Sequence, residues 1–233
     1  MDLINVSRRI MVDIEKLDDI VDSYFEPIKD LTDTASDIFT PIKAIHSLYT
    51  FNKKIKFKKF LKAYAKSLNE NGFSNFDDTE KLKRYLKDEK NFNFLSDTIE
   101  NAINSKSMFG SVLLGYYAGQ ILSQCERINY KDLIIIEGLK ELNDIELSCF
   151  ARIYNRADLS KMVIFHELNL RGFEFFSKLT IDKLIQLRFI TKDHTVYHGS
   201  NGSYNFISTN VAEELFFLIK VVGLNDELLN FHY

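Results

Sequence analysis

Apolar residues in the region 10–49 recur at spacings that alternate between four and three positions without a break. This is the period of helices that pair along an apolar seam. Pro27 and Pro41 interrupt the region, and a proline is tolerated in the first turn of a helix but not in its middle. We therefore expect two or three amphipathic helices packed against the rest of the protein. The alternatives are an oligomerising coiled coil and a hairpin that reaches a partner or a membrane surface.

The next region, residues 51–66, is both basic and amphipathic. Phe57, Phe60, Leu61 and Tyr64 recur at helical spacing and predict one buried face. We expect the lysines to form a solvated face whose charge is balanced by acidic segments nearby. Binding of an anionic partner, through phosphate groups or an anionic lipid surface, is the alternative. The lysines concerned are Lys53, Lys54, Lys56, Lys58, Lys59 and Lys62.

Residues 107–125 form the longest stretch without a charged residue. Small residues recur in it every four positions, so that they form one ridge on a helix, and large apolar residues cover most of the remaining circumference. Glycine opposes helix formation by about 1 kcal/mol relative to alanine, so we expect neighbouring helices to approach the ridge closely in compensation. The pattern predicts a central buried helix. The ridge residues are Ser107, Ser111, Gly115, Gly119 and Ser123.

The same stretch also has to be considered as a membrane span. At 1.5 Å per residue it is about 28 Å long, which is just enough to cross the apolar core of a bilayer. Its serines and glutamines, and the polar segments on both sides, favour a buried soluble helix. We therefore expect no insertion into a membrane.

Two further helices are predicted around this stretch. Residues 91–105 place Phe94, Leu95, Ile99 and Ile103 on one side, and residues 131–142 carry Leu133, Ile134, Leu139 and Leu142. Gly138 and the pair Asn143–Asp144 are expected break points, and Asp144 is a candidate cap for the helix that follows. We place a boundary here, between a helical bundle at 1–142 with heptad-like N-terminal helices and a C-terminal subdomain at 143–233.

The C-terminal region predicts the order helix, helix, β-hairpin, helix. One helix is predicted at 160–166 and a second at 180–187, which runs directly into strands at 189–192 and 195–198. A glycine-containing turn leads to a strand at 204–208, and Thr209 or Asn210 caps a last helix at 210–222. This order is typical of a winged-helix module. The predicted fold class is thus mainly α, a helical bundle around a central buried helix, with a small winged-helix-like α+β C-terminal subdomain.

A winged helix that binds DNA needs basic or amide residues on its recognition helix and a basic wing. The predicted helix offers Lys183 and Arg188, but the hairpin has no lysine or arginine between Asp193 and Tyr204. Residues 150–233 are neutral overall, with equal numbers of basic and acidic side chains. We therefore expect protein docking or a purely structural role for this subdomain, and DNA binding is the less favoured alternative.

Composition narrows the class of protein. Of the 233 residues, 45% are hydrophobic and 27% charged, which is ordinary for a globular protein. Two cysteines, Cys125 and Cys149, exclude a disulfide framework and favour a reducing cytoplasm, and no signal peptide is visible. The net charge of −3 is unevenly distributed, with a basic segment between acidic ones. Self-association of unlike segments is as well supported as binding of an external anionic partner.

Motifs for catalysis and for cofactors are missing from the sequence. There is no phosphate-binding glycine loop, no nucleophile elbow and no cysteine pair at zinc spacing. His166-Glu167 lacks the second histidine of a zinc protease, and His194 and His198 lie in a predicted strand. We therefore predict no catalytic, cofactor-binding or metal-binding residues, although a site assembled from distant residues would leave no such motif.

Three stretches carry a resemblance to known proteins: FNKKIKFKKFLKAY, SVLLGYYAGQIL followed by INYKDLIIIEGLKEL, and the winged-helix-like tail. The helical body resembles a group of uncharacterised bacterial proteins linked to phage defence, including the abortive-infection alpha type. In the tail, Arg188 and Ala212 or Glu213 stand where those proteins have glycines. The resemblance implies a bacterial or phage-related protein and transfers no catalytic residue.

Together these observations favour a non-enzymatic, cytoplasmic protein that acts through contacts with a protein partner or with further copies of itself. A phage-related pathway, including anti-phage defence, is the expected setting. The first alternative is a nucleic-acid-binding regulator that uses the lysines of residues 53–62 together with Lys183 and Arg188. The second is a membrane-acting effector.

Overall fold

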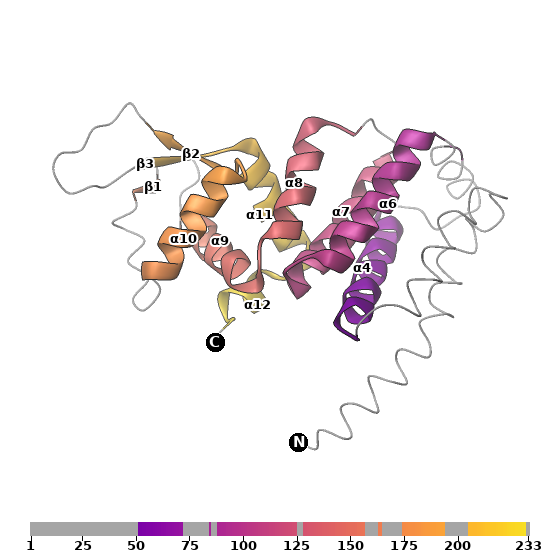
Figure 1. Cartoon of the computed structure of the whole chain (residues 1–233), viewed down its shortest axis with the longest axis horizontal. Coiled ribbons are helices and arrows are strands. Elements are labelled where there is room, and N and C mark those ends of the chain that lie inside the picture. Colours follow the sequence, from indigo (N-terminus) through magenta and orange to yellow (C-terminus); the bar gives the residue numbers. More distant parts are fainter. Residues whose placement is uncertain are drawn as a thin grey trace, which may run out of the picture. The chain divides into compact units, whose positions relative to one another are not determined.

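The computed structural model describes residues 51–71, 84, 88–124, 128–156, 163–164, 174–193 and 205–231. Within these residues the protein is mainly helical, with one small antiparallel sheet (Figure 1). The predicted mainly α class is confirmed at this level. The heptad-like region at 10–49 and the turn at 199–203 lie outside the described residues, as does Cys125.

The chain divides into two compact units. The first comprises residues 1–104 and 114–127, and the second comprises residues 105–113 and 128–233. Helix α7 (Met108–Gln124) contributes to both, because its residues up to Leu113 belong to the second unit and the remainder to the first. The boundary expected near residue 143 falls within the second unit.

In the first unit, α4 (Phe51–Glu70) packs directly on the glycines of α7 (Figure 1). A Cβ atom added at Gly115 would lie 2.2 Å from the carbonyl oxygen of Phe60, and one at Gly119 would lie 2.7 Å from that of Tyr64. No side chain fits at such distances, so the two helix backbones come closer than larger residues would allow. The close approach predicted for the small-residue ridge is confirmed at both glycines.

The core of the first unit is built by α4, α7 and α6 (Glu89–Asn104), and α4 packs along α6. The residues predicted to face inward are buried: Phe57, Phe60, Leu61 and Tyr64 of α4, and Phe94, Leu95, Ile99 and Ile103 of α6. The apolar side chains of α7 from Leu113 to Leu122 are buried as well, as predicted for this stretch. In the described part of the chain, no helix is sufficiently long and apolar to span a membrane.

In the second unit, α8 (Tyr130–Glu141) departs from the prediction at Gly138. Gly138 does not break the helix but is buried inside it, where a Cβ atom would lie 2.3 Å from the ring of Phe189. The glycine therefore makes room for that ring. Leu133, one of the apolar residues named for this helix, is 51% exposed. The helix instead buries the face that carries Ile135, Ile136 and Leu139.

Helix α9 (Asp144–Arg156) begins where a break was expected, but its cap is not Asp144. Asn143 accepts a hydrogen bond from the N–H of Glu146 at 2.9 Å, and the Glu146 carboxylate accepts one from the N–H of Asn143 at 2.8 Å. This reciprocal pair is a capping box. The Asp144 carboxylate instead accepts hydrogen bonds from the Ser107 hydroxyl and the N–H of Phe109, at the start of α7.

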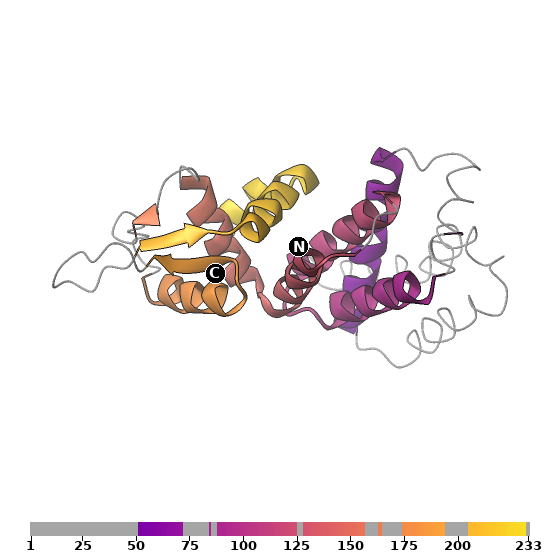
Figure 2. The same ribbon diagram turned by 90° about the horizontal axis from the view of Figure 1, so that it is seen from above.

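The sheet has the strand order β1-β3-β2 and is antiparallel throughout. Strand β1 (Val163–Ile164) pairs with β3 (Asn205–Ser208), which also pairs with β2 (Ile190–Asp193) from Ile190 opposite Ser208 onward. Figure 2 shows β2 and β3 side by side, with α10 (Glu174–Gln186) alongside. Strands β2 and β3 agree with the strands predicted at 189–192 and 204–208, whereas the strand predicted at 195–198 lies outside the described residues. Helix α10 begins earlier than residue 180, and β1 lies where a helix at 160–166 was predicted, because its residues pair with β3.

Helix α11 (Asn210–Val222) has the predicted bounds and the predicted cap. The Thr209 side chain accepts a hydrogen bond from the N–H of Ala212, and the helix ends at Gly223, whose φ of 84° is left-handed. Helix α11 packs against α8 and α9, and α9 also packs against α10 and the short α12 (Asn225–Leu229). Because these contacts join elements on both sides of residue 143, α8 belongs with the C-terminal elements.

Candidate protein-docking surface

The six lysines predicted as a possible anionic-partner site all lie on α4, but they do not form one exposed face. Lys59 and Lys62 are exposed, on the side opposite the buried residues of α4. The other four are half-buried: Lys53, Lys54, Lys56 and Lys58. One turn further on, Lys66 pairs with Glu70 at 3.7 Å, which places an acidic group at the end of the basic arc. The exposed basic surface of α4 is therefore narrower than the sequence predicted.

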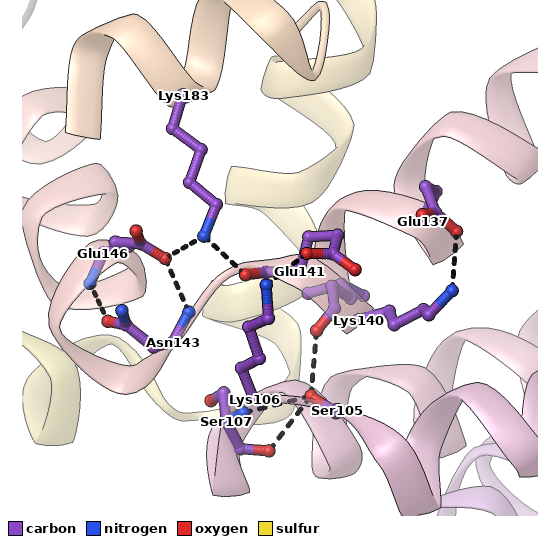
Figure 3. Close-up of polar contacts among 10 residues, drawn as sticks. Ser105, Lys106, Ser107, Glu137, Lys140, Glu141, Asn143, Glu146 and Lys183 are labelled. Carbon is purple, nitrogen blue, oxygen red and sulfur yellow. Dashed lines mark hydrogen bonds and ion pairs between the residues drawn. The ribbon is translucent and has the colours of Figure 1, made fainter. Parts of the chain in front are cut away.

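Lys183, the predicted contact on α10, is half-buried in a polar cluster instead of facing solvent (Figure 3). Its ammonium group donates to the backbone oxygen of Glu141 and to the carboxylate of Glu146, both at 2.6 Å. The same carboxylate caps α9 through Asn143. Lys183 thus holds the end of α8 and the start of α9 together from α10, and its charge is already neutralised.

The remainder of this cluster attaches residues 105–107 to the end of α8 (Figure 3). The Ser105 hydroxyl donates to the backbone oxygen of Leu139 at 3.0 Å, and the N–H of Lys106 donates to that of Lys140 at 3.0 Å. The Lys106 side chain forms an ion pair with Glu141. The hydrogen bond that the Lys106 ammonium group donates to Glu141 within this ion pair raises the pKa of Lys106 and lowers the pKa of Glu141, because it favours the charged form of each.

The polar groups of the cluster thus bind one another and backbone oxygens, so the cluster holds α8, α9 and α10 together. Burial raises the pKa of the Cys149 thiol, which makes this side chain a poor nucleophile. Within the described residues, no group of three or more His, Cys, Asp or Glu side chains is placed to hold a metal ion. All five histidines lie outside those residues.

Arg188, the second predicted contact in this unit, lies just beyond α10 with a φ of 63°. The N–H of Phe189 donates to the oxygen of Leu184 and that of Arg188 to the oxygen of Ile185, which is the Schellman motif that ends many helices. The residue at this position is usually glycine. The Arg188 guanidinium lies 5.5 Å from the centroid of the Tyr130 ring, on the exposed start of α8. Lys183 and Arg188 therefore serve different purposes and form no joint anionic-partner site.

A different surface stands out on α11. This helix buries one side, formed by Ala212, Leu215, Phe216, Leu218 and Ile219, but Phe217 remains 61% exposed and Val221 40% exposed. The exposed residues of α11 recur at spacings of three and four, so they share one side of the helix. We call this side the α11 face; it consists of Asn210, Glu213, Phe217, Lys220 and Val221.

Polar contacts fix the position of the α11 face within its unit. The Glu214 carboxylate forms an ion pair with Lys131, which joins α11 to α8 beside the exposed Tyr130. The ammonium group of Lys220 lies 4.4 Å from the centroid of the buried Phe216 ring. The contact with Phe216 holds Lys220 at one end of the α11 face. The largest exposed apolar group of this face is the Phe217 ring.

The sequence alone did not predict this surface. The segment NVAEELFFLIKVV was predicted as a helix, but because it is apolar at most positions the sequence did not indicate which of its residues are exposed. The signal was the pair Phe216-Phe217: neighbours on a helix point about 100° apart, so the face that buries one tends to expose the other. Val221, four residues after Phe217, is in phase with the exposed ring.

Comparison with models of protein families, with curated proteins and with solved structures finds no match to this chain.

Proposed function

We propose that this protein is a non-enzymatic interaction module and that the α11 face is its docking surface for a protein. The exposure of Phe217 and Val221 on one side of a well-capped helix is the observation that carries this proposal. Large apolar side chains that share an exposed helix face mark sites where a second protein removes them from water. Aromatic residues at the centre of such sites commonly carry much of the binding free energy.

The proposal includes a winged-helix fold for residues 144–222. The elements α9, β1, α10, β2, β3 and α11 follow one another in that order. The strand order β1-β3-β2 places the strand that precedes α10 beside the returning strand of the hairpin. This connectivity supports the winged-helix assignment that the order of elements in the sequence suggested.

The surface of α10 favours protein docking over DNA recognition for this fold. Of the α10 side chains that the structure describes, the exposed ones are Leu179, Asp182 and Gln186, which offer an apolar group, an acid and an amide. A recognition helix needs groups that bind phosphates or base edges, and an acid at its surface opposes both. The one lysine among these side chains, Lys183, is held by Glu146.

One observation favours nucleic acid as a second candidate partner. Lys59 and Lys62 are exposed on adjacent turns of α4, and Lys66 continues their line. Binding through such residues is weakened by salt, because each phosphate contact releases counterions. A fluorescence anisotropy titration with a short DNA duplex and a single-stranded RNA tests it at low and at physiological salt. Salt-sensitive binding that the K59E/K62E variant loses would support this candidate, and its absence at low salt would eliminate it.

Site-specific photo-crosslinking tests the proposed docking surface. A benzophenone amino acid is placed at Phe217 in the full chain, and the producing cells are irradiated. Because a crosslink forms only with groups in contact with the probe, we expect one discrete product of higher mass. The matched control carries the same probe at Glu227, which is exposed on α12 and outside the α11 face.

The yields of crosslinked product at positions 217 and 227 decide between the outcomes. A product specific to position 217, and lost when Val221→Asp is added to the probe-carrying chain, supports the proposal. Val221→Asp changes an exposed residue, so it leaves the packing of the core intact. Equal yields at positions 217 and 227, or no product at either, would contradict the proposal.

A further inference from the structure

The α11 face carries charges of opposite sign at its two ends. Glu213 lies in the first turn of the helix and Lys220 in the last, and the apolar Phe217 lies midway between them. The face is therefore acidic, then apolar, then basic along the helix axis, and this order determines which partner fits it best.

A face with this order is complementary to itself when the second copy runs in the opposite direction. We infer that the protein forms a symmetric dimer in which the α11 faces of two copies pack antiparallel about a two-fold axis at Phe217. Residues equally far before and after Phe217 then come opposite each other, so that Glu213 of one copy meets Val221 of the other and lies next to its Lys220. This inference rests on the proposed docking function and names the partner.

Three properties of the α11 face favour this arrangement over a parallel one. The two Phe217 rings lie together at the axis and leave water as a pair. Each acidic end lies beside a basic end, whereas parallel helices would place like charges next to each other. The helix dipoles also oppose each other when the helices are antiparallel, which is the favourable orientation. An interface of this kind, in which the same patch serves both subunits, is the commonest in soluble oligomers.

The other exposed features of the described chain do not specify a partner in this way. The basic arc of α4 has no acidic counterpart of similar extent on the same helix, so two copies of it would repel each other. Tyr130 and Leu133 are both exposed on α8. The guanidinium group of Arg188 lies over the Tyr130 ring, and the charged residues further along this helix, Glu137 and Lys140, pair with each other. The α11 face combines an exposed apolar centre with charges of opposite sign at its two ends.

Sedimentation velocity of the full chain, from nanomolar to high micromolar concentration, tests the inference. We expect the sedimentation coefficient to rise from that of a monomer to that of a dimer. F217S, which removes an exposed ring, should raise the dissociation constant about tenfold or more without loss of the folded state, which circular dichroism checks. E227K, a charge change on α12 outside the α11 face, is the control and should leave the dissociation constant unchanged.

Two charge-reversal variants provide the sharper part of the experiment. K220E places a carboxylate beside Glu213 of the second copy, and E213K places an ammonium group beside Lys220 of the second copy, so each variant alone should be largely monomeric. An equimolar mixture restores unlike charges at both ends of the interface, and we expect it to form a mixed dimer. A general loss of folding could not produce such rescue.

Each outcome bears on either the inference or the function it rests on. Dimers that F217S weakens and that the K220E and E213K mixture restores support the inference. A wild-type chain that is monomeric throughout, or dimers that F217S does not weaken, overturn it. If the position 217 probe still gives a specific crosslink in that case, the face docks a different protein, and the proposed function stands without the dimer.

Discussion

Arg188 adopts a left-handed backbone conformation at the end of α10, and its guanidinium lies 5.5 Å from the centroid of the Tyr130 ring. A non-glycine residue in this conformation carries a steric cost of roughly 1–2 kcal/mol, because its Cβ atom approaches the following carbonyl oxygen. A cation over an aromatic ring at an exposed site returns about 0.5–1 kcal/mol. The contact of the Arg188 side chain with Tyr130 therefore offsets part of the steric cost of its backbone conformation at the end of α10.

The backbone strain at Arg188 can be measured by comparing two substitutions. R188A and R188G both remove the contact with Tyr130, but only glycine adopts a φ of 63° without a steric cost. We expect R188G to exceed R188A in the free energy of unfolding by about 1 kcal/mol, measured by urea denaturation. Gly223→Ala at the end of α11 is the matched control, because φ there is 84° and no atom lies within 4 Å of the added Cβ; it should cost a similar amount. Equal stabilities of R188A and R188G would show that the conformation is not strained.

Gly115→Ala tests the packing of α4 on α7. In an isolated helix this substitution stabilises by about 1 kcal/mol. Here the added Cβ would lie 2.2 Å from the backbone oxygen of Phe60, so the two helices must separate. We expect a net loss of about 1–3 kcal/mol in the free energy of unfolding, as for other overpacked cores. A gain in stability on Gly115→Ala would contradict the close approach.

Lys183→Met distinguishes a structural lysine from one that binds a partner. The substitution removes the hydrogen bonds to the Glu141 backbone oxygen and the Glu146 carboxylate. Hydrogen bonds to charged groups are worth about 1.5–3 kcal/mol, so we expect the free energy of unfolding to fall by an amount of this order. Lys62→Met, on the exposed side of α4, should change it by less than about 0.5 kcal/mol. Equal effects of the two substitutions on stability would be inconsistent with the cluster in Figure 3.

Tyr116 gives the stability of the first unit a defined dependence on pH. Burial, and then a hydrogen bond donated to Glu70 at 2.8 Å, raise the pKa of Tyr116 to about 12 from the ordinary value of 10.0. Between these two values the unfolded chain releases the phenolic proton while the folded chain retains it. The free energy of unfolding should therefore fall as the pH rises from 10 toward 12, and it should fall less in Tyr116→Phe. Denaturation at a series of pH values measures this difference, and parallel curves for the two proteins would rule out the raised pKa.

Much of the fold could be predicted from local patterns. The bounds and cap of α11 followed from Thr209 and from a largely apolar segment without proline or glycine, and the inward residues of α4 and α6 followed from helical spacing. The close approach at the glycine ridge of α7 could be predicted because glycine destabilises a helix, so a glycine such as Gly115 in a helix indicates close packing by a neighbour. These features depend on residues that are close in the sequence.

The features that the sequence did not predict depend on residues that are distant from one another. Gly138 was expected to break a helix, but the ring that requires it belongs to Phe189. Asp144 was expected to cap its own helix, yet it binds Ser107 and Phe109 at the start of α7. Lys183 was a possible contact in the less favoured DNA-binding alternative, and it is held by Glu141 and Glu146. In each case a local rule was overridden by a tertiary contact.

The α11 face was missed for a related reason. The apolar pattern of a largely apolar helix does not indicate which of its residues are buried. The helices that cover α11 are also distant in the sequence, as α8 is. Only packing against α8 and α9 determines that Phe216 is buried and Phe217 is exposed. The candidate site therefore required the structure.

Thiol labelling at position 217 tests most directly whether the α11 face is covered by protein in the cell. Phe217→Cys and, as a control, Glu227→Cys are prepared with Cys125 replaced by serine, while the buried Cys149 is retained. The rate of labelling by a permeant maleimide is measured in producing cells and in the diluted, purified chain. We predict that the thiol introduced at position 217 reacts several-fold more slowly in cells than after dilution, and that the thiol introduced at position 227 reacts at the same relative rate in both. Equal behaviour of the two positions would contradict the account.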